Sequence, residues 1–101
     1  MNRIERIVEC IKKYQPEKII VFGSYARGEG DEYSDIDFIV IKKTEKRFIE
    51  RLIEVAKLID NKWGDIDIFV YTPEEFEQMS KLGNSFIESV LKEGKVIYEK
   101  K

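Results

Sequence analysis

Hydrophobic positions recur along the chain with two alternating periods, and these predict helices and strands in turn. Near the N-terminus they lie three or four residues apart until a proline, which predicts a helix over residues 3–15 with Asn2 as its N-cap. A compact β-branched run over residues 18–22 then predicts a buried strand. The polar stretch 23–34 contains three glycines and is expected to form an irregular connection.

The middle of the chain repeats this alternation of strand and helix. Residues 35–42 and 65–71 have the period-two pattern of strands. Between them, Thr44 is the predicted N-cap of a long amphipathic helix. The predicted apolar face of that helix carries Phe48, Leu52, Val55, Ala56 and Ile59.

The last third of the chain predicts two more helices and a final strand. Residues 72–75 are typical of a helix start, because proline fits the first helical position and Glu75 can bond back to the cap. Gly94 closes a last helix, and residues 96–98 are expected to add a short edge strand. The apolar positions of that last helix are Phe86, Ile87, Val90 and Leu91. Strands that alternate with helices predict an α/β fold, a small mixed β-sheet flanked by helices.

Length and composition restrict the partners that such a fold can have. The chain has 101 residues, of which 43% are hydrophobic, so we expect a single packed domain over residues 1–101. Eighteen basic and twenty acidic residues give a net charge of −2, which disfavours a long nucleic-acid substrate. Apolar runs do not exceed four residues, so we expect no membrane span and a cytoplasmic location.

Two of the predicted strands begin with pairs of aspartates. Residues two apart in a strand face the same way, so Asp35 and Asp37 project together, and Asp65 and Asp67 repeat the pattern. If the two strands are neighbours, the four carboxylates converge. Their spacing does not choose between Asp65 and Asp67 as the partner of the first pair.

Converging carboxylates repel one another and require a cation. Oxygen ligands without nearby His or Cys select Mg²⁺ or Mn²⁺ over zinc, and Mg²⁺ usually works together with substrate phosphates. Gly23 and Ser24 directly follow a buried strand, where backbone amides can approach an anion closely. Arg27 on the same segment is a candidate for phosphate contact, and a solvent-exposed charge is its alternative.

The spacing of these residues resembles a known family. Gly23-Ser24, ten intervening residues and then Asp35-Ile36-Asp37 is similar to the signature of the polymerase-β-like nucleotidyltransferases, and specifically of their minimal (MNT) branch. The likeness covers nearly the whole chain and implies that family's fold. It implies that Asp35, Asp37 and Asp67 are catalytic residues that hold two Mg²⁺ ions. It further implies that Gly23 and Ser24 grip the triphosphate of ATP or another nucleoside triphosphate.

The same resemblance implies an activity and a partner. The sequence ends after the catalytic core, so we expect the acceptor to be another molecule. Proteins of the MNT branch are commonly encoded beside a HEPN RNase toxin and act as its antitoxin, in part by transferring AMP from ATP to a HEPN tyrosine. A transferase acting on a small molecule such as an aminoglycoside is an alternative, and a non-catalytic nucleotide-binding protein that masks a partner is another. A homo-oligomer is compatible with all three.

Overall fold

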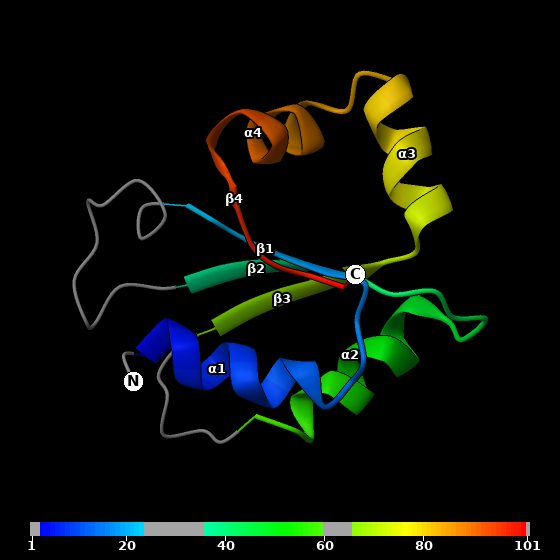
Figure 1. Cartoon of the computed structure of the whole chain (residues 1–101). Coiled ribbons are helices and arrows are strands. Elements are labelled where there is room, and N and C mark those ends of the chain that lie inside the picture. Colours follow the sequence, from blue (N-terminus) through cyan, green and yellow to red (C-terminus); the bar gives the residue numbers. More distant parts are fainter. Residues whose placement is uncertain (1–2, 24–35, 60–65, 101) are drawn as a thin grey trace.

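The computed structural model describes residues 3–23, 36–59 and 66–100, and these form a four-stranded mixed sheet with helices on both faces (Figure 1). The strands are β1 (Lys18–Phe22), β2 (Ile36–Ile41), β3 (Ile66–Tyr71) and β4 (Lys95–Glu99). The helices are α1 (Arg3–Lys12), α2 (Phe48–Ala56), α3 (Pro73–Lys81) and α4 (Ser85–Glu93). The strand order is β3-β2-β1-β4. β1 runs antiparallel to β2 and β4, whereas β2 and β3 are parallel, so the predicted small mixed sheet is confirmed.

Alternate residues of the strands fill two cores, one on each side of the sheet. In Figure 1, α1 and α2 cover the lower face, and α3 and α4 lie above the upper face. The lower core joins Ile7 and Ile11 of α1 and Val55 of α2 to strand residues such as Phe38. The upper core joins strand residues to Val90 and to a group of partly buried aromatic rings. Both faces of the sheet are therefore packed, which fixes its register.

The ends of several predicted elements differ from those observed. The first helix ends at Lys12 rather than at residue 15, and its predicted cap Asn2 lies outside the described residues. α2 begins at Phe48, so Thr44 is not its N-cap; Arg47 holds that position with extended backbone and no side-chain cap bond. The Thr44 hydroxyl instead accepts a hydrogen bond from the backbone N–H of Lys46 at 3.1 Å, a local turn that delays the helix.

The apolar faces of two helices are also narrower than predicted. Ala56 of α2 is exposed, and Leu91 of α4 is 58% exposed. Arg51, which is only 6% exposed, takes a buried position on α2 that the predicted apolar face did not include. The predicted start of α3 is confirmed as a reciprocal capping box, because Thr72 and Glu75 bond each other's backbone N–H groups.

No helix within the described part of the chain is long and apolar enough to cross a membrane.

Candidate active site

Asp37 and Asp67 lie side by side on neighbouring parallel strands. They are register partners in the β2–β3 pair, and in a parallel pair such partners project from the same face. Strand alternation puts both on the upper face, which is the face packed by α3 and α4. Asp37 is half-buried and Asp67 is exposed. The predicted convergence of carboxylates from two strands is therefore present for this pair.

Gly23 lies at the same end of the sheet, directly after β1. The preceding residue, Phe22, is the antiparallel partner of Asp37, and the backbone turns at Gly23 with a φ of 93°. A Cβ atom built on Gly23 would come within 2.5 Å of the Asp37 Oδ2 atom. The positive φ favours glycine at this position, and any other residue would also displace the Asp37 carboxylate. The carboxylate of Asp37 is thus packed directly against the backbone of the glycine turn.

Three aromatic rings support this end of the sheet from above. Phe86 of α4 lies edge-on to Phe22, with ring centroids 5.3 Å apart, and edge-on to Phe69, with centroids 5.5 Å apart. Phe22 adjoins Gly23 in the chain, and Phe69 is two residues beyond Asp67 on the same face of β3. One helix side chain therefore bridges the two strands that flank the one carrying Asp37.

The other predicted site residues lie outside the described residues. These are Ser24, Arg27, Asp35 and Asp65. Within the part of the chain that the structure describes, no group of three or more His, Cys, Asp or Glu side chains is arranged to hold a metal ion. The described residues therefore supply two carboxylates and the glycine turn of the predicted site, and the roles of all its members remain predictions.

The opposite end of the sheet carries an ion pair between a buried arginine and a partly exposed glutamate, which the sequence patterns did not reveal. Arg51 donates to both carboxylate oxygens of Glu75, at 2.7 and 3.3 Å, and also to the carbonyl oxygens of Val70 and Lys46. The hydrogen bond from Arg51 is the main cause that lowers the pKa of Glu75 from its usual value. The same carboxylate accepts the backbone N–H of Thr72 at 2.8 Å. This contact joins α2 to the start of α3, so its role is structural.

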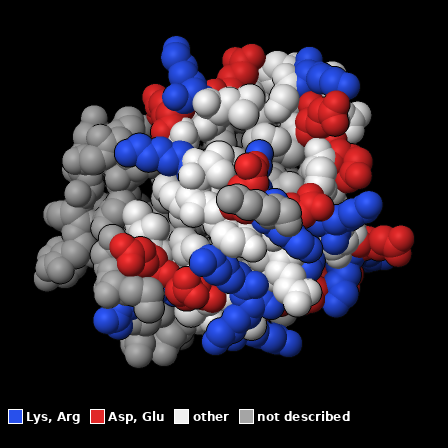
Figure 2. All heavy atoms as spheres, in the orientation of Figure 1, with Lys and Arg blue, Asp and Glu red and all other residues white. Residues whose placement is uncertain are grey.

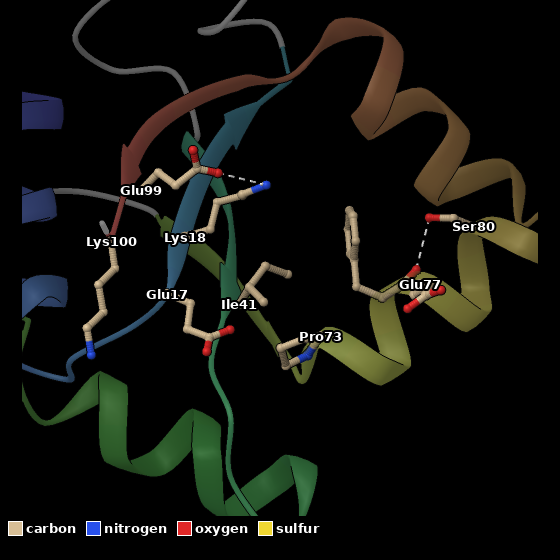
Figure 3. A pocket seen from close by; sticks show the side chains of 9 residues that line it. Glu17, Lys18, Ile41, Pro73, Glu77, Ser80, Glu99 and Lys100 are labelled. Atoms are coloured by element: carbon tan, nitrogen blue, oxygen red, sulfur yellow. Dashed lines mark hydrogen bonds and ion pairs between the residues drawn. The ribbon is translucent and has the colours of Figure 1, made fainter.

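A groove of about 680 Å³ also lies at that opposite end, between β1, β4 and α3 (Figure 3). Its lining mixes charges of both signs, including Glu17, Glu77 and Lys100. Lys18 at its edge is paired with Glu99 at 3.1 Å (Figure 3). Because Lys18 starts β1 and Phe22 beside Asp37 ends it, the groove is separate from the aspartates.

A pair of carboxylates beside a glycine turn is suited to bind a divalent cation and a phosphate. Comparison with known proteins shows which family the chain belongs to. The sequence matches the family described as polymerase beta, nucleotidyltransferase, over residues 5–101. A protein of Methanocaldococcus jannaschii named "Putative protein adenylyltransferase MJ0604" is 36% identical over 99 residues, which cover 94% of each chain. A second from that organism, "Putative protein adenylyltransferase MJ1305", is 35% identical over 95% of this chain and 69% of its own length.

The fold agrees with this assignment. A crystal structure of a toxin–antitoxin with AMP-PNP superimposes on this chain with a TM-score of 0.68, at 23% identity, covering all of this chain and 76% of that one. The chain belongs to the polymerase beta nucleotidyltransferase family. The family and the class of enzyme predicted from the Gly-Ser and Asp-x-Asp spacing are thereby confirmed.

Proposed function

We propose that this protein is a Mg²⁺-dependent nucleotidyltransferase that transfers AMP from ATP to a tyrosine hydroxyl of a partner HEPN RNase toxin, and that it acts as the antitoxin. The observation that carries the proposal is the junction of Asp37, Asp67 and Gly23 at one end of the sheet. Residues of three adjacent strands meet there, and each has a distinct task in nucleotidyl transfer.

The residues at this junction fit a pair of divalent cations. Asp37 and Asp67 offer oxygen ligands from adjacent strands, and the chain contains no histidine to favour zinc. We assign Asp35 as another ligand, because it precedes Asp37 by two residues in the Asp-x-Asp motif. Bound cations would lower the pKa of the acceptor hydroxyl and stabilise the leaving pyrophosphate.

The chain itself binds and orients the nucleotide. Gly23 lets the backbone approach phosphate oxygens, Ser24 adds a hydroxyl, and Arg27 adds a positive charge. The acceptor oxygen forms a bond to the α-phosphorus of ATP, and the bond to the bridging oxygen breaks on the opposite side. Pyrophosphate leaves with that oxygen, and the proton of the hydroxyl passes to solvent.

AMP as the transferred group and a protein as the acceptor are supported by the similar proteins. The relatives from Methanocaldococcus jannaschii are named as protein adenylyltransferases. The structure of similar fold is a toxin–antitoxin with an ATP analogue. The net charge of −2 also favours a protein acceptor over RNA.

Calorimetry with ATP tests the nucleotide site without a partner. Binding is expected in Mg²⁺ and is expected to disappear in EDTA, because the carboxylates repel phosphates when no cation is bound. Asp37→Asn and Asp67→Asn should abolish the Mg²⁺-dependent binding while the melting temperature stays the same or rises. Asp65→Asn is the matched comparison and should be milder; a larger effect than that of Asp67→Asn would move the third ligand to Asp65.

Mass spectrometry tests the acceptor. A HEPN protein encoded beside this chain should gain one or more AMP masses on a tyrosine when the two are co-expressed, and Asp35→Asn should prevent the gain. The antitoxin proposal is wrong if the partner co-purifies unmodified and keeps full RNase activity in the complex. Transfer to a small molecule such as an aminoglycoside would then be the activity to assay.

A further inference from the structure

A second hollow, of about 490 Å³, lies on the lower side of the sheet, where α1 ends beside α2. The side chains that matter for its charge are those of Lys13, Lys42, Lys46, Lys57 and Glu54, and Tyr14 forms part of its wall. Lys42 directly follows β2, so this hollow lies at the opposite end of that strand from Asp37. Figure 2 shows Lys and Arg side chains gathered over this region of the molecule.

The hollow carries an excess of positive charge. Four lysines face one glutamate, a surplus of three in a chain whose net charge is −2. Only Lys46 has a carboxylate partner within the hollow, since its Nζ lies 2.9 Å from Glu54 Oε1. In the described part of the chain, the ammonium groups of Lys13 and Lys57 have no hydrogen-bond or ion-pair partner. Like charges that line one hollow repel one another, and a bound anion would relieve that repulsion.

One of the four lysines is held in place by the backbone. The Nζ of Lys42 donates to the carbonyl oxygens of Tyr14, at 2.7 Å, and Gln15, at 3.3 Å, and lies 4.8 Å from the centre of the Tyr14 ring. It thereby donates to two carbonyls in the turn just after α1, as basic side chains near helix C-termini commonly do. Lys46 is paired with Glu54, so the charges of Lys13 and Lys57 are the two that stay available to a ligand.

The wall of the hollow also contains a polar group that the chain does not satisfy. Tyr14 is 8% exposed, and among the described residues its hydroxyl has no hydrogen-bond partner. Burial raises the pKa of this hydroxyl above its usual value, and the nearby charge of Glu54 raises it further. A buried hydroxyl without a partner costs free energy, so this region is not optimised for stability alone.

We propose that this lysine hollow is a second anion site, which binds a diphosphate group without a metal ion. A diphosphate carries about three negative charges near neutral pH, which matches the surplus, and lysines bind phosphate as point charges. The group can belong to free pyrophosphate or to a nucleotide, and its chemistry is the same in both. The site is independent of the function proposed above, since it uses neither Asp37 nor Gly23.

Calorimetry in EDTA separates this site from the aspartate site. Sodium pyrophosphate is the probe, and wild-type protein should bind it in EDTA with an affinity that falls as NaCl is raised. The double variant Lys13→Gln/Lys57→Gln should bind at least about tenfold more weakly, because two charge-assisted hydrogen bonds are lost. The matched control Lys92→Gln/Lys95→Gln removes the same charge from exposed positions that do not line the hollow and should bind like wild type.

Further measurements identify whether the bound diphosphate belongs to a nucleotide or to free pyrophosphate, and they complete the test. ADP binding as tightly as pyrophosphate would assign the site to a nucleotide, and weaker ADP binding would assign it to free pyrophosphate. Asp37→Asn should leave pyrophosphate binding in EDTA unchanged. A failure of the lysine site can therefore be distinguished from a failure of the proposed transferase. Absence of pyrophosphate binding to wild type in EDTA, or equal loss in both lysine double variants, would overturn the proposal. Circular dichroism checks that the variants fold. If the double variant Lys13→Gln/Lys57→Gln does not fold, the single variant Lys13→Gln takes its place.

Discussion

Gly23→Ala is the substitution that most directly tests the packing of the glycine turn against Asp37. The added Cβ would lie 2.5 Å from Asp37 Oδ2, and ordinary contact begins near 3.4 Å, so the carboxylate must move by about 0.9 Å. A side-chain oxygen can move cheaply, so this shift costs little stability. A misplacement of about 1 Å in a catalytic site costs on the order of a hundredfold in rate. The positive φ of 93° adds about 1 to 2 kcal/mol of backbone strain.

Gly83→Ala is the matched control for that strain. Gly83 also has a positive φ, of 71°, but a Cβ there would meet only Glu88 Oε1 at 3.7 Å. Both variants should therefore melt several degrees below wild type, since about 1 kcal/mol shifts the melting temperature of a domain of this size by about 4 to 8 °C. Transfer of AMP, and calorimetric binding of ATP in Mg²⁺, should fail only in Gly23→Ala. If Gly23→Ala transfers AMP as fast as Gly83→Ala, the close approach to Asp37 is not used in the reaction.

Three further predictions concern the contacts that hold the two ends of the sheet. The lowered pKa of Glu75 means that its ion pair stabilises the fold above pH 4.5 and that this gain is lost as the pH falls through its folded pKa. Thermal melts should therefore show Glu75→Gln about 1 kcal/mol less stable than wild type at pH 7, with this difference shrinking as the pH falls through the folded pKa of Glu75, and the exposed Glu74→Gln unchanged throughout. Arg51→Met should cost about 3 kcal/mol in urea unfolding, because it removes the donor to the buried carbonyl of Val70 and both hydrogen bonds from the guanidinium to Glu75; a loss under 1 kcal/mol would contradict this. Phe86→Ala should cost about 2 to 4 kcal/mol and also slow AMP transfer, since its ring supports Phe22 beside the glycine turn; unchanged transfer at a temperature where the variant is folded would refute the second part.

The sequence was sufficient to predict the sheet because its strands carry strong and repeated signals. The runs of β1, β2 and β3 are short, rich in β-branched residues and bounded by turn residues, so their positions follow from local pattern. The alternation of aspartates with apolar residues was sufficient to predict the face that each strand presents, but the choice of Asp67 over Asp65 came from the family resemblance, and the register of β2 and β3 came from the structure. The predicted Thr72–Glu75 cap depended only on four consecutive residues, and it is present.

Local pattern failed where distant contacts decide the outcome. Thr44 has the right side chain for an N-cap, but the backbone between β2 and α2 needs a turn before the helix can start. Arg51 occupies a buried position because Glu75, 24 residues away, supplies its partner. The signal that could have revealed it is an arginine one helical turn before Val55, within an apolar face. The lysines of the second hollow lie on three separate segments, and no spacing in the sequence brings them together.

The strand order gives the two described aspartates backbones of unequal rigidity. β2 carries Asp37 in the interior of the sheet and is hydrogen-bonded on both sides, whereas β3 carries Asp67 at the edge and is bonded on one side. Interior strands open only with the whole fold, and edge strands exchange their amide hydrogens through smaller local openings. The amide of Asp67 should therefore exchange with deuterium faster than that of Asp37. In the site proposed above, Asp37 would therefore keep its position while Asp67 could shift as ATP is converted into pyrophosphate and a transferred AMP group.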